Sequence, residues 1–425
     1  MNHPILDRTQ GRRAHTQLGG ESTQRQSLFK AQCSQATPQT NGLCPRRRCH
    51  VVQNIRTSWQ TYRHLSRRTL SPADRPFYIL GVAPDELTRP DVVGPLLVAA
   101  TGNPDWAAPT PRLIAGGKSN LTFELTSPAG SLILRRPPSG RLLARAHDMG
   151  REARIQRALG STAVPVARII LEHGDSDMLG VPFYVMEKVP GVVLRDDLPE
   201  GYASQPRERV ALADALIDTL AAIHRVDPGK IGLGDFGKPE GFAARQVRTW
   251  TRQWEASKAH DVEVVDELAS RLSTHQWNPQ ARGSIVHGDY RFDNCLFDFG
   301  DTSRINAVLD WELSTLGDPL TDLGMLLFYW AESGEVAPAL TPAVTAKPGF
   351  PGRRYVAERY GRAMEIDLLD LSAYVALAHF KFVGIAQGIA ARVAAKQMAG
   401  QDFGDLEDEI VRIATLGLAV LDQGS

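Results

Sequence analysis

Cysteine is scarce in this sequence, with four among 425 residues. Three of them, Cys33, Cys44 and Cys49, fall within the first 73 residues, so the rest of the chain has only Cys295 and cannot form an internal disulfide. With His50 these three thiols match a zinc site poorly, because the gap from Cys44 to Cys49 is wider than in a zinc knuckle. The cysteine usage favours a reducing compartment, and we expect a cytoplasmic protein.

Long apolar runs are also missing from the sequence. A membrane helix needs roughly 18 uninterrupted apolar residues. The best stretch, from Tyr374 to Val393, is interrupted by His379, Lys381 and Arg392. We therefore expect no membrane partner.

Acidic residues are nearly absent from the N-terminus. Residues 1–73 hold 12 Lys and Arg but only two acids, Asp7 and Glu21, whereas the remainder carries 36 basic and 46 acidic residues. An acidic body argues against a nucleic-acid partner, because such proteins bind phosphates through clustered Lys and Arg. Residues 1–73 lack a sustained apolar period and are predicted to be a disordered basic tail. A targeting peptide, or residues upstream of the true start, are the alternatives.

The remaining chain is long enough for two lobes. Residues 74–188 predict an N-terminal lobe with a first helix over 85–102, a second helix over 148–159 and five short strands. The strands are expected at 112–114, 121–125, 131–134, 166–172 and 183–187. Residues 189–425 predict a larger, mainly helical lobe, beginning with an apolar stripe at helical spacing that ends near His224.

Two catalytic signatures are absent or misplaced. No GxSxG segment occurs, so a serine hydrolase of the nucleophile-elbow type lacks its main support. The string from Gly232 to Gly237 matches GxGxxG but follows the turn Pro228-Gly229 and not a strand, which argues against a dinucleotide site.

The segment from His287 to Asn294, His-Gly-Asp-Tyr-Arg-Phe-Asp-Asn, carries the most chemical information. It places the Asp289 carboxylate and the Asn294 carboxamide in a loop before a short strand. A second strand then ends at Asp310, and a hairpin between the two strands would bring Asp310 beside the first two side chains. Phosphoryl transfer needs such a set, namely a carboxylate to deprotonate the acceptor and oxygen ligands for magnesium.

These segments resemble the aminoglycoside phosphotransferase/choline kinase-like family. The residues that carry the resemblance are His287-Gly-Asp289, Asn294, Val308-Leu-Asp310-Trp-Glu312 and Gly317-Asp-Pro319 with Asp322. More narrowly, Leu134-Arg-Arg-Pro-Pro138, Trp311-Glu312 and Phe380-Lys381 with Gly388-Ile389 and Arg392 are similar to the kinase-like domain fused to acyl-CoA dehydrogenases and its free-standing bacterial relatives. The resemblance covers roughly residues 85–420.

The resemblance implies an α+β, protein-kinase-like fold of two lobes that uses ATP and Mg²⁺. It makes Asp289 the catalytic base and makes Asn294 and Asp310 the magnesium ligands. Asp322 would brace the catalytic loop from below. His287 is expected to pack and hydrogen-bond within that loop, because Asp289 already supplies the base.

The N-terminal lobe is expected to hold the nucleotide. Gly116, Gly117, Ser119 and Asn120 lie in the turn between the first two strands, where backbone amides and a hydroxyl would cover the phosphates. The segment between the lobes would offer main-chain hydrogen bonds to adenine, at Met186, Glu187 and Val189.

Arg135 stands where related kinases place a strand lysine that grips the phosphates and pairs with a helix carboxylate, here Glu152. Strand alternation favours Arg135 over Arg136 for this role. Arginine keeps the charge and can bind both phosphate and carboxylate, but it is longer and planar.

The predicted function is transfer of the ATP γ-phosphate to a hydroxyl of a small molecule, either aminoglycoside-like or a hydroxyacyl metabolite. An alternative is an inactive nucleotide-binding scaffold, motivated by Arg135 and by Asp293, an extra carboxylate beside Asn294. A protein kinase is a third interpretation. Gly288, in place of the usual arginine, and the absence of an Ala-Pro-Glu segment argue against it.

Overall fold

The computed structural model describes residues 82–114, 120–138, 148–278, 283–394 and 406–423. All of them belong to one compact unit that begins at Leu70. The predicted basic tail, with its three thiols, lies outside the described residues. The limits set above for the two lobes therefore stay predictions.

A five-stranded antiparallel sheet forms the centre of the N-terminal lobe, in the order β1-β2-β3-β5-β4. Its strands are β1 (Thr110–Leu113), β2 (Leu121–Ser127), β3 (Gly130–Arg136), β4 (Ile169–His173) and β5 (Phe183–Glu187). Alternate residues of β3 pack on opposite faces: Leu132 and Leu134 join the core under α2 and α3, and Ile133 joins the core under α4.

The predicted first helix is two helices. α2 (Pro84–Thr88) and α3 (Pro90–Thr101) are separated by Arg89, whose φ of 45° and ψ of 70° are left-handed. A residue before proline is disfavoured in the helical region, and Arg89 precedes Pro90. The Arg89 amide donates instead to the Asp85 carbonyl at 2.8 Å, which ends α2.

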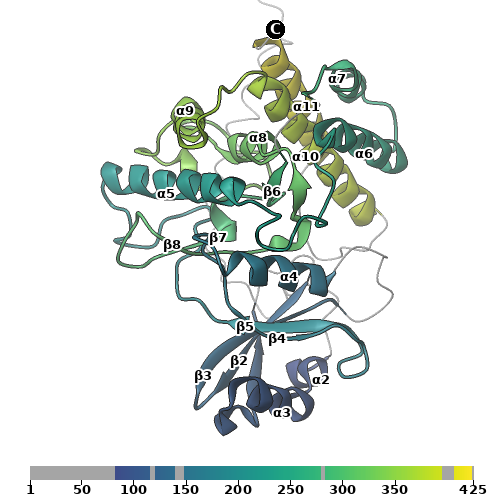
Figure 1. Ribbon diagram of the computed structural model, residues 1–425. Helices are drawn as coiled ribbons and strands as arrows, with labels where there is room; N and C mark the ends of the chain where they lie inside the picture. The colour runs from purple at the N-terminus through teal and green to yellow at the C-terminus, as the bar shows by residue number, and fades with distance from the viewer. Residues whose placement is uncertain (1–81, 115–119, 139–147, 279–282, 395–405, 424–425) are drawn as a thin grey trace, which may run out of the picture. The chain divides into compact units, whose positions relative to one another are not determined.

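α4 (Met149–Leu159) lies between the sheet and the helical lobe (Figure 1). The Asp148 carboxylate caps it by accepting the Arg151 amide at 2.9 Å. Glu152, Ile155 and Leu159 are buried on its inner side, as the helical spacing predicts. This helix therefore carries a carboxylate from the N-terminal lobe to the boundary with the second lobe.

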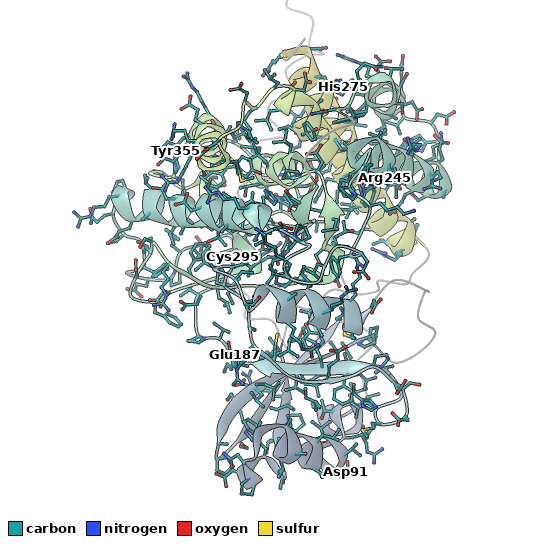
Figure 2. All side chains as sticks on the ribbon, viewed as in Figure 1. Asp91, Glu187, Arg245, His275, Cys295 and Tyr355 are labelled. Carbon is teal, nitrogen blue, oxygen red and sulfur yellow. The ribbon has the colours of Figure 1, made fainter. Side chains whose placement is uncertain are left out.

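The second lobe is mainly helical, as predicted. Its long helices are α5 (Pro206–Arg225), α6 (Phe242–Ser257), α7 (Glu263–Thr274), α8 (Leu320–Tyr329), α9 (Arg353–Met364), α10 (Leu371–Ala394) and α11 (Leu406–Gln423). Short 3₁₀ turns occur at Pro104–Trp106, Phe292–Asn294 (η4), Trp311–Leu313 (η5) and Val344–Ala346. Figure 2 shows Cys295 inside this lobe and Glu187 at the sheet. Burial raises the pKa of the Cys295 thiol, so this cysteine behaves as a core residue.

α10 combines length with an apolar composition. Its length and mean hydropathy of 1.3 over its best window would suffice to cross a membrane, although 67% of that window is buried inside the protein. The core residues Tyr374, Phe380 and Val383 pack it against its neighbours. This burial is typical of a core helix.

Two small strand pairs lie below the helices. β6 (Ser284–Val286) pairs with β9 (Thr315–Gly317), and β7 (Cys295–Phe297) pairs with β8 (Ile305–Val308), both antiparallel. The predicted hairpin is therefore present. With the five-stranded sheet and the helical lobe, it confirms the predicted α+β fold class.

Candidate active site

The loop after β6 carries the predicted base. At Gly288 the backbone has a φ of 86°, in the left-handed region that favours glycine. A Cβ there would approach Leu313 to 2.9 Å. The loop therefore turns tightly against η5, and Asp289 follows with 23% of its side chain exposed.

Asp322, in the first turn of α8, holds this loop from inside. Its Oδ2 accepts the His287 amide at 2.6 Å, and its Oδ1 accepts the Gly288 amide at 2.9 Å. Burial alone would raise the pKa of Asp322, but the adjacent His224 and the His287 amide outweigh burial and lower it. The His287 Nε2 lies 2.8 Å from the Leu309 carbonyl, which ties the loop to the end of β8.

Asn294 lies beside Asp289 at the end of η4. Its Nδ2 donates to the Asp289 carbonyl at 2.8 Å and to the Asp289 Oδ2 at 3.1 Å. Both bonds use the amide nitrogen, so the carbonyl oxygen of the carboxamide is directed away from Asp289. That oxygen therefore makes no hydrogen bond to Asp289.

Asp310 follows β8 and comes back beside Asn294. The Leu309 amide donates to the Asn294 carbonyl at 2.8 Å, which fixes the spacing between the two segments. Asp310 itself has a φ of 63° and a ψ of 61°, a left-handed conformation that is uncommon for a residue other than glycine and is often found at functional sites. The structure therefore brings the three predicted side chains to one place.

Arg135 of β3 joins this group from the N-terminal lobe. Its Nη2 lies 3.0 Å from the Asp310 Oδ1 and 3.1 Å from the Glu152 Oε1. Burial and the nearby Asp310 raise the pKa of Glu152 despite the guanidinium, because Glu152 is 1% exposed. The structure thus places Arg135 where the strand cation was predicted. Arg136 instead donates to the Pro137 carbonyl at 3.1 Å.

The donor set fits magnesium held together with a nucleotide. Within the described parts of the chain, no group of three or more His, Cys, Asp and Glu side chains is arranged to hold a metal ion. The Asp310 carboxylate and the Asn294 carboxamide oxygen remain. Mg²⁺ in nucleotide sites is typically bound by one or two such oxygens, with phosphates and water completing its octahedron.

A family model agrees with this geometry. The model for the phosphotransferase enzyme family matches residues 110–356, which run from β1 into α9 and include all three side chains. The chain belongs to this phosphotransferase family.

Curated relatives of this chain are larger proteins. It is 34% identical over 307 residues to human acyl-CoA dehydrogenase family member 11, covering 71% of this chain and 39% of that protein. It is 34% identical over 304 residues to mouse family member 10, covering 70% and 28%. The chain thus spans about two fifths or less of the length of these relatives. The predicted narrower resemblance is confirmed.

Solved structures agree on the fold. A candidate aminoglycoside phosphotransferase from Ralstonia eutropha is 34% identical, with a TM-score of 0.65, and the match covers 74% of this chain and 93% of that one. The ternary complex of aminoglycoside phosphotransferase APH(4)-Ia with AMP-PNP and hygromycin B is 15% identical, with a TM-score of 0.51 over 78% and 99% of the two chains. The second match supports the fold alone.

Three further residues surround the Asp289 carboxylate of this phosphotransferase. The Tyr329 hydroxyl donates to Oδ1 at 2.7 Å, the Arg291 Nε lies 3.3 Å from Oδ2, and the Lys381 Nζ donates to the Gly288 carbonyl at 2.6 Å. Burial alone would raise the pKa of Asp289. Arg291, Lys381 and the tyrosine hydroxyl outweigh burial and lower it, so the carboxylate is ionised at neutral pH.

Asp293, the extra carboxylate beside Asn294, is paired with arginines. Its Oδ2 lies 2.6 Å from the Arg195 Nη1, and its Oδ1 lies 3.1 Å from the Arg291 Nε. Burial raises its pKa in spite of these partners. The carboxylate is therefore committed to an ion pair network within the large lobe.

The predicted phosphate loop is only partly described. Gly116, Gly117 and Ser119 lie outside the described residues. Asn120, the next residue, is buried, and its Nδ2 donates to the Glu312 Oε2 at 3.2 Å. The end of the loop is thus joined to η5, directly after Asp310.

In the segment between the lobes, only some of the backbone groups predicted to contact adenine are free of other hydrogen bonds among the described residues. The Glu187 amide donates to the Arg168 carbonyl at 3.0 Å, and its carboxylate accepts the Arg168 amide at 3.1 Å. Met186 is a buried strand residue that packs under α4. The Glu187 amide is already occupied, so Val189 is the better candidate for a main-chain contact from this segment.

The GxGxxG string from Gly232 to Gly237 has a packing role. The Arg151 guanidinium of α4 lies 3.7 Å from the centre of the Phe236 ring and donates to the Phe236 carbonyl and, at 3.2 Å, to the Ser314 carbonyl. Arg154, one helical turn further, donates to the Gly232 carbonyl at 2.9 Å. The segment therefore clamps α4, and with it Glu152, to the large lobe.

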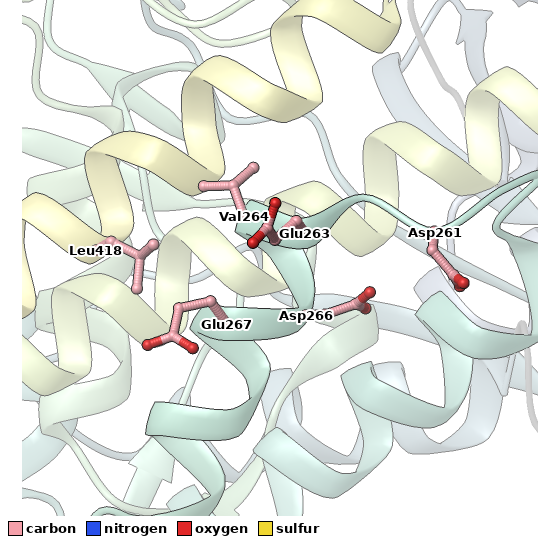
Figure 3. A pocket seen from close by; sticks show the side chains of 6 residues that line it. All are labelled: Asp261, Glu263, Val264, Asp266, Glu267 and Leu418. Carbon is pink, nitrogen blue, oxygen red and sulfur yellow. The ribbon is translucent and has the colours of Figure 1, made fainter.

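A cavity of about 800 Å³ lies away from these residues, beside α7 and α11 (Figure 3). Its wall carries four carboxylates, from Asp261, Glu263, Asp266 and Glu267, together with Val264 and Leu418. Lys258 lies 2.9 Å from Asp261 and 4.0 Å from Asp266 and neutralises part of this charge. None of the residues that line the cavity belongs to the phosphotransferase motifs.

The sequence indicated some of these residues only weakly. Lys381 was part of the narrower resemblance, without a role, and Arg291 lay unremarked inside the catalytic segment. Tyr329 had no signal, because a tyrosine at the end of an apolar helix is typical of a core position.

Proposed function

We propose that this chain is an ATP- and magnesium-dependent kinase that transfers the γ-phosphate to a hydroxyl of a small molecule. The observation that carries the proposal is the convergence of Asp289, Asn294 and Asp310, with Arg135 reaching Asp310 from the other lobe. Family membership supports the same reaction class.

Each group has one task in the proposed reaction. Asp289 accepts the proton of the acceptor hydroxyl. At the same time the hydroxyl oxygen of the acceptor forms a bond to the γ-phosphorus. The bond between the γ-phosphorus and the β,γ-bridging oxygen breaks, and ADP leaves. Asn294 and Asp310 would hold Mg²⁺, which neutralises charge on the phosphates when bound. Arg135 would bind the same phosphates and keeps its charge at any physiological pH.

One observation favours a hydroxyacyl acceptor over an aminoglycoside. The curated relatives are acyl-CoA dehydrogenase family members. We propose an acceptor that carries its hydroxyl on an acyl chain.

The scaffold alternative is less well supported than the kinase. It was motivated by Arg135 and Asp293. Arg135 makes the expected pair with Glu152, and Asp293 is neutralised by Arg195 and Arg291. The contacts of Arg135 and Asp293 are therefore both compatible with an active kinase.

The test is thermal unfolding with and without Mg·ATP, because a ligand that binds only the folded state raises Tm. We expect a magnesium-dependent rise in the wild type, its loss in Asp310→Ala and its retention in Asp301→Ala, a change in the exposed turn of the same hairpin. Mg·ATP turnover is then measured with hygromycin B, a hydroxy acid and a hydroxyacyl-CoA. A shift without turnover in the wild type would favour the nucleotide-binding scaffold, and no shift with no turnover would overturn both proposals.

A further inference from the structure

The two oxygens of Asp289 are held from different sides. Oδ2 faces Asn294 at 3.1 Å and therefore lies on the side of the proposed metal. Oδ1 accepts the Tyr329 hydroxyl at 2.7 Å. The carboxylate thus has one oxygen fixed by the catalytic loop itself and the other fixed by a helix that follows it in the chain.

Tyr329 is itself held in place. It is the last residue of α8 and 5% exposed, and its ring lies 5.4 Å from Phe328 and 6.3 Å from Phe382, centre to centre. The Arg291 guanidinium lies 5.1 Å from the ring centre on a further side. A hydroxyl on a ring packed in this way has little freedom to follow a moving carboxylate.

α8 contacts the catalytic loop at both of its ends. Asp322, in the first turn, accepts the amides of His287 and Gly288, and Tyr329, at the end, donates to the Asp289 side chain. Tyr329 lies seven positions after Asp322, which is about two helical turns, so both lie on one face of the helix. One rigid element therefore sets both the backbone and the side chain of the predicted base.

We propose that Tyr329 is a positioning residue that orients the Asp289 carboxylate toward the acceptor hydroxyl. The inference rests on the proposed kinase function. Tyr329 is almost fully buried, so it acts through Asp289 and not by touching the acceptor. The Tyr329 hydrogen bond should raise the rate by keeping the base in position, because displacing a base by about 1 Å from its acceptor can lower the rate roughly 10²-fold.

The test is Tyr329→Phe, which removes the hydroxyl and keeps the packed ring. Turnover of Mg·ATP is measured with whichever of hygromycin B, the hydroxy acid or the hydroxyacyl-CoA reacts fastest. We expect kcat to fall about 10- to 100-fold, the range for a hydrogen bond to a charged group. The KM for Mg·ATP and the Mg·ATP-induced rise in Tm stay at wild-type values.

Tyr374→Phe is the matched control. The Tyr374 hydroxyl donates to the Asp318 carboxylate at 2.6 Å, so this change also removes a tyrosine–aspartate hydrogen bond within the large lobe. We expect it to lower Tm at least as much as Tyr329→Phe does and to leave kcat unchanged. Equal effects of the two variants on kcat would mean that Tyr329 contributes only stability and would overturn the inference.

A double-mutant cycle with Asp289→Asn sharpens the test. If Tyr329 acts through the carboxylate, Tyr329→Phe lowers kcat much less in the Asp289→Asn background than in the wild type. Additive effects would overturn the inference and leave the proposed function standing. A wild type that transfers no phosphate to any acceptor would overturn both.

Discussion

The two sides of the proposed reaction centre are built differently. On the nucleotide side, polar contacts join the two lobes: Arg135 to Asp310 and Asn120 to Glu312. On the acceptor side, the contacts to the Asp289 loop come from within the large lobe, through Tyr329 of α8 and Lys381 of α10.

The difference lies in the elements that supply the contacts. The contacts on the nucleotide side involve loops and strand ends that carry recognisable motifs. The contacts on the acceptor side come from apolar core helices. Under the proposed function, the position of the base should therefore depend on α8 and α10.

The largest effect expected separates the two sides directly. Asp289→Asn should lower kcat by about 10²- to 10⁴-fold, because the base is lost, and should retain the Mg·ATP-induced rise in Tm. Asp310→Asn should lose both turnover and that rise. Turnover and the Mg·ATP-induced rise in Tm are measured on the same samples. If both variants lost nucleotide binding equally, the distinction between the two sides would be wrong.

Arg135→Met tests the nucleotide side. It leaves Glu152 buried without its cation, which should destabilise the protein by about 3–5 kcal/mol and raise the KM for Mg·ATP. Urea unfolding without nucleotide measures the first effect. The double variant Arg135→Met/Glu152→Leu removes both charges and should recover much of the stability but not the KM. A single variant as stable as the double one would contradict the role given to this pair.

Lys381→Met tests the acceptor side. The Lys381 Nζ supports the Gly288 carbonyl directly before Asp289, so we expect kcat to fall about tenfold with the KM for Mg·ATP unchanged. Lys347→Met, which removes only the pair with exposed Asp197, is the control. A raised nucleotide KM in Lys381→Met would show that α10 does not belong to the acceptor side alone.

The smallest effect on kcat is expected from a change at His379, which lies two residues before Lys381. This residue should instead affect how stability depends on pH. Burial lowers its pKa from 6.5 to about 4. Because the folded pKa lies below the unfolded one, the unfolded chain binds the extra proton, and stability falls as the pH drops from about 6.5 toward 4. At pH 5 the loss is about 2 kcal/mol. His379→Gln should flatten this dependence in urea unfolding at pH 7 and pH 5.

The sequence predicted the convergence of three polar side chains better than it predicted their surroundings. Asp289, Asn294 and Asp310 lie within about twenty residues, on a hairpin whose pairing follows from two short strands. Tyr329 and Lys381 reach the same loop from 40 and 93 residues further along the chain. Their positions depend on how α8 and α10 pack, and apolar periodicity does not specify which polar residue of a core helix faces a site.

The sequence predicts one helix where the structure has two. The break at Arg89 follows from Pro90, but the apolar pattern continues across it. The contact of the GxGxxG string with α4 was not predicted, because neither Phe236 nor Arg151 carries a local signal of it.

The clamp of Arg151 on Phe236 has a consequence for how such an enzyme is controlled. A helix that carries an essential carboxylate can act as a switch only if it is free to rotate away. Here the helix is fastened to the opposite lobe by a stacked guanidinium and two carbonyl contacts. The clamp therefore holds Glu152 beside Arg135, so under the proposed function we expect activity to depend little on a rotation of α4.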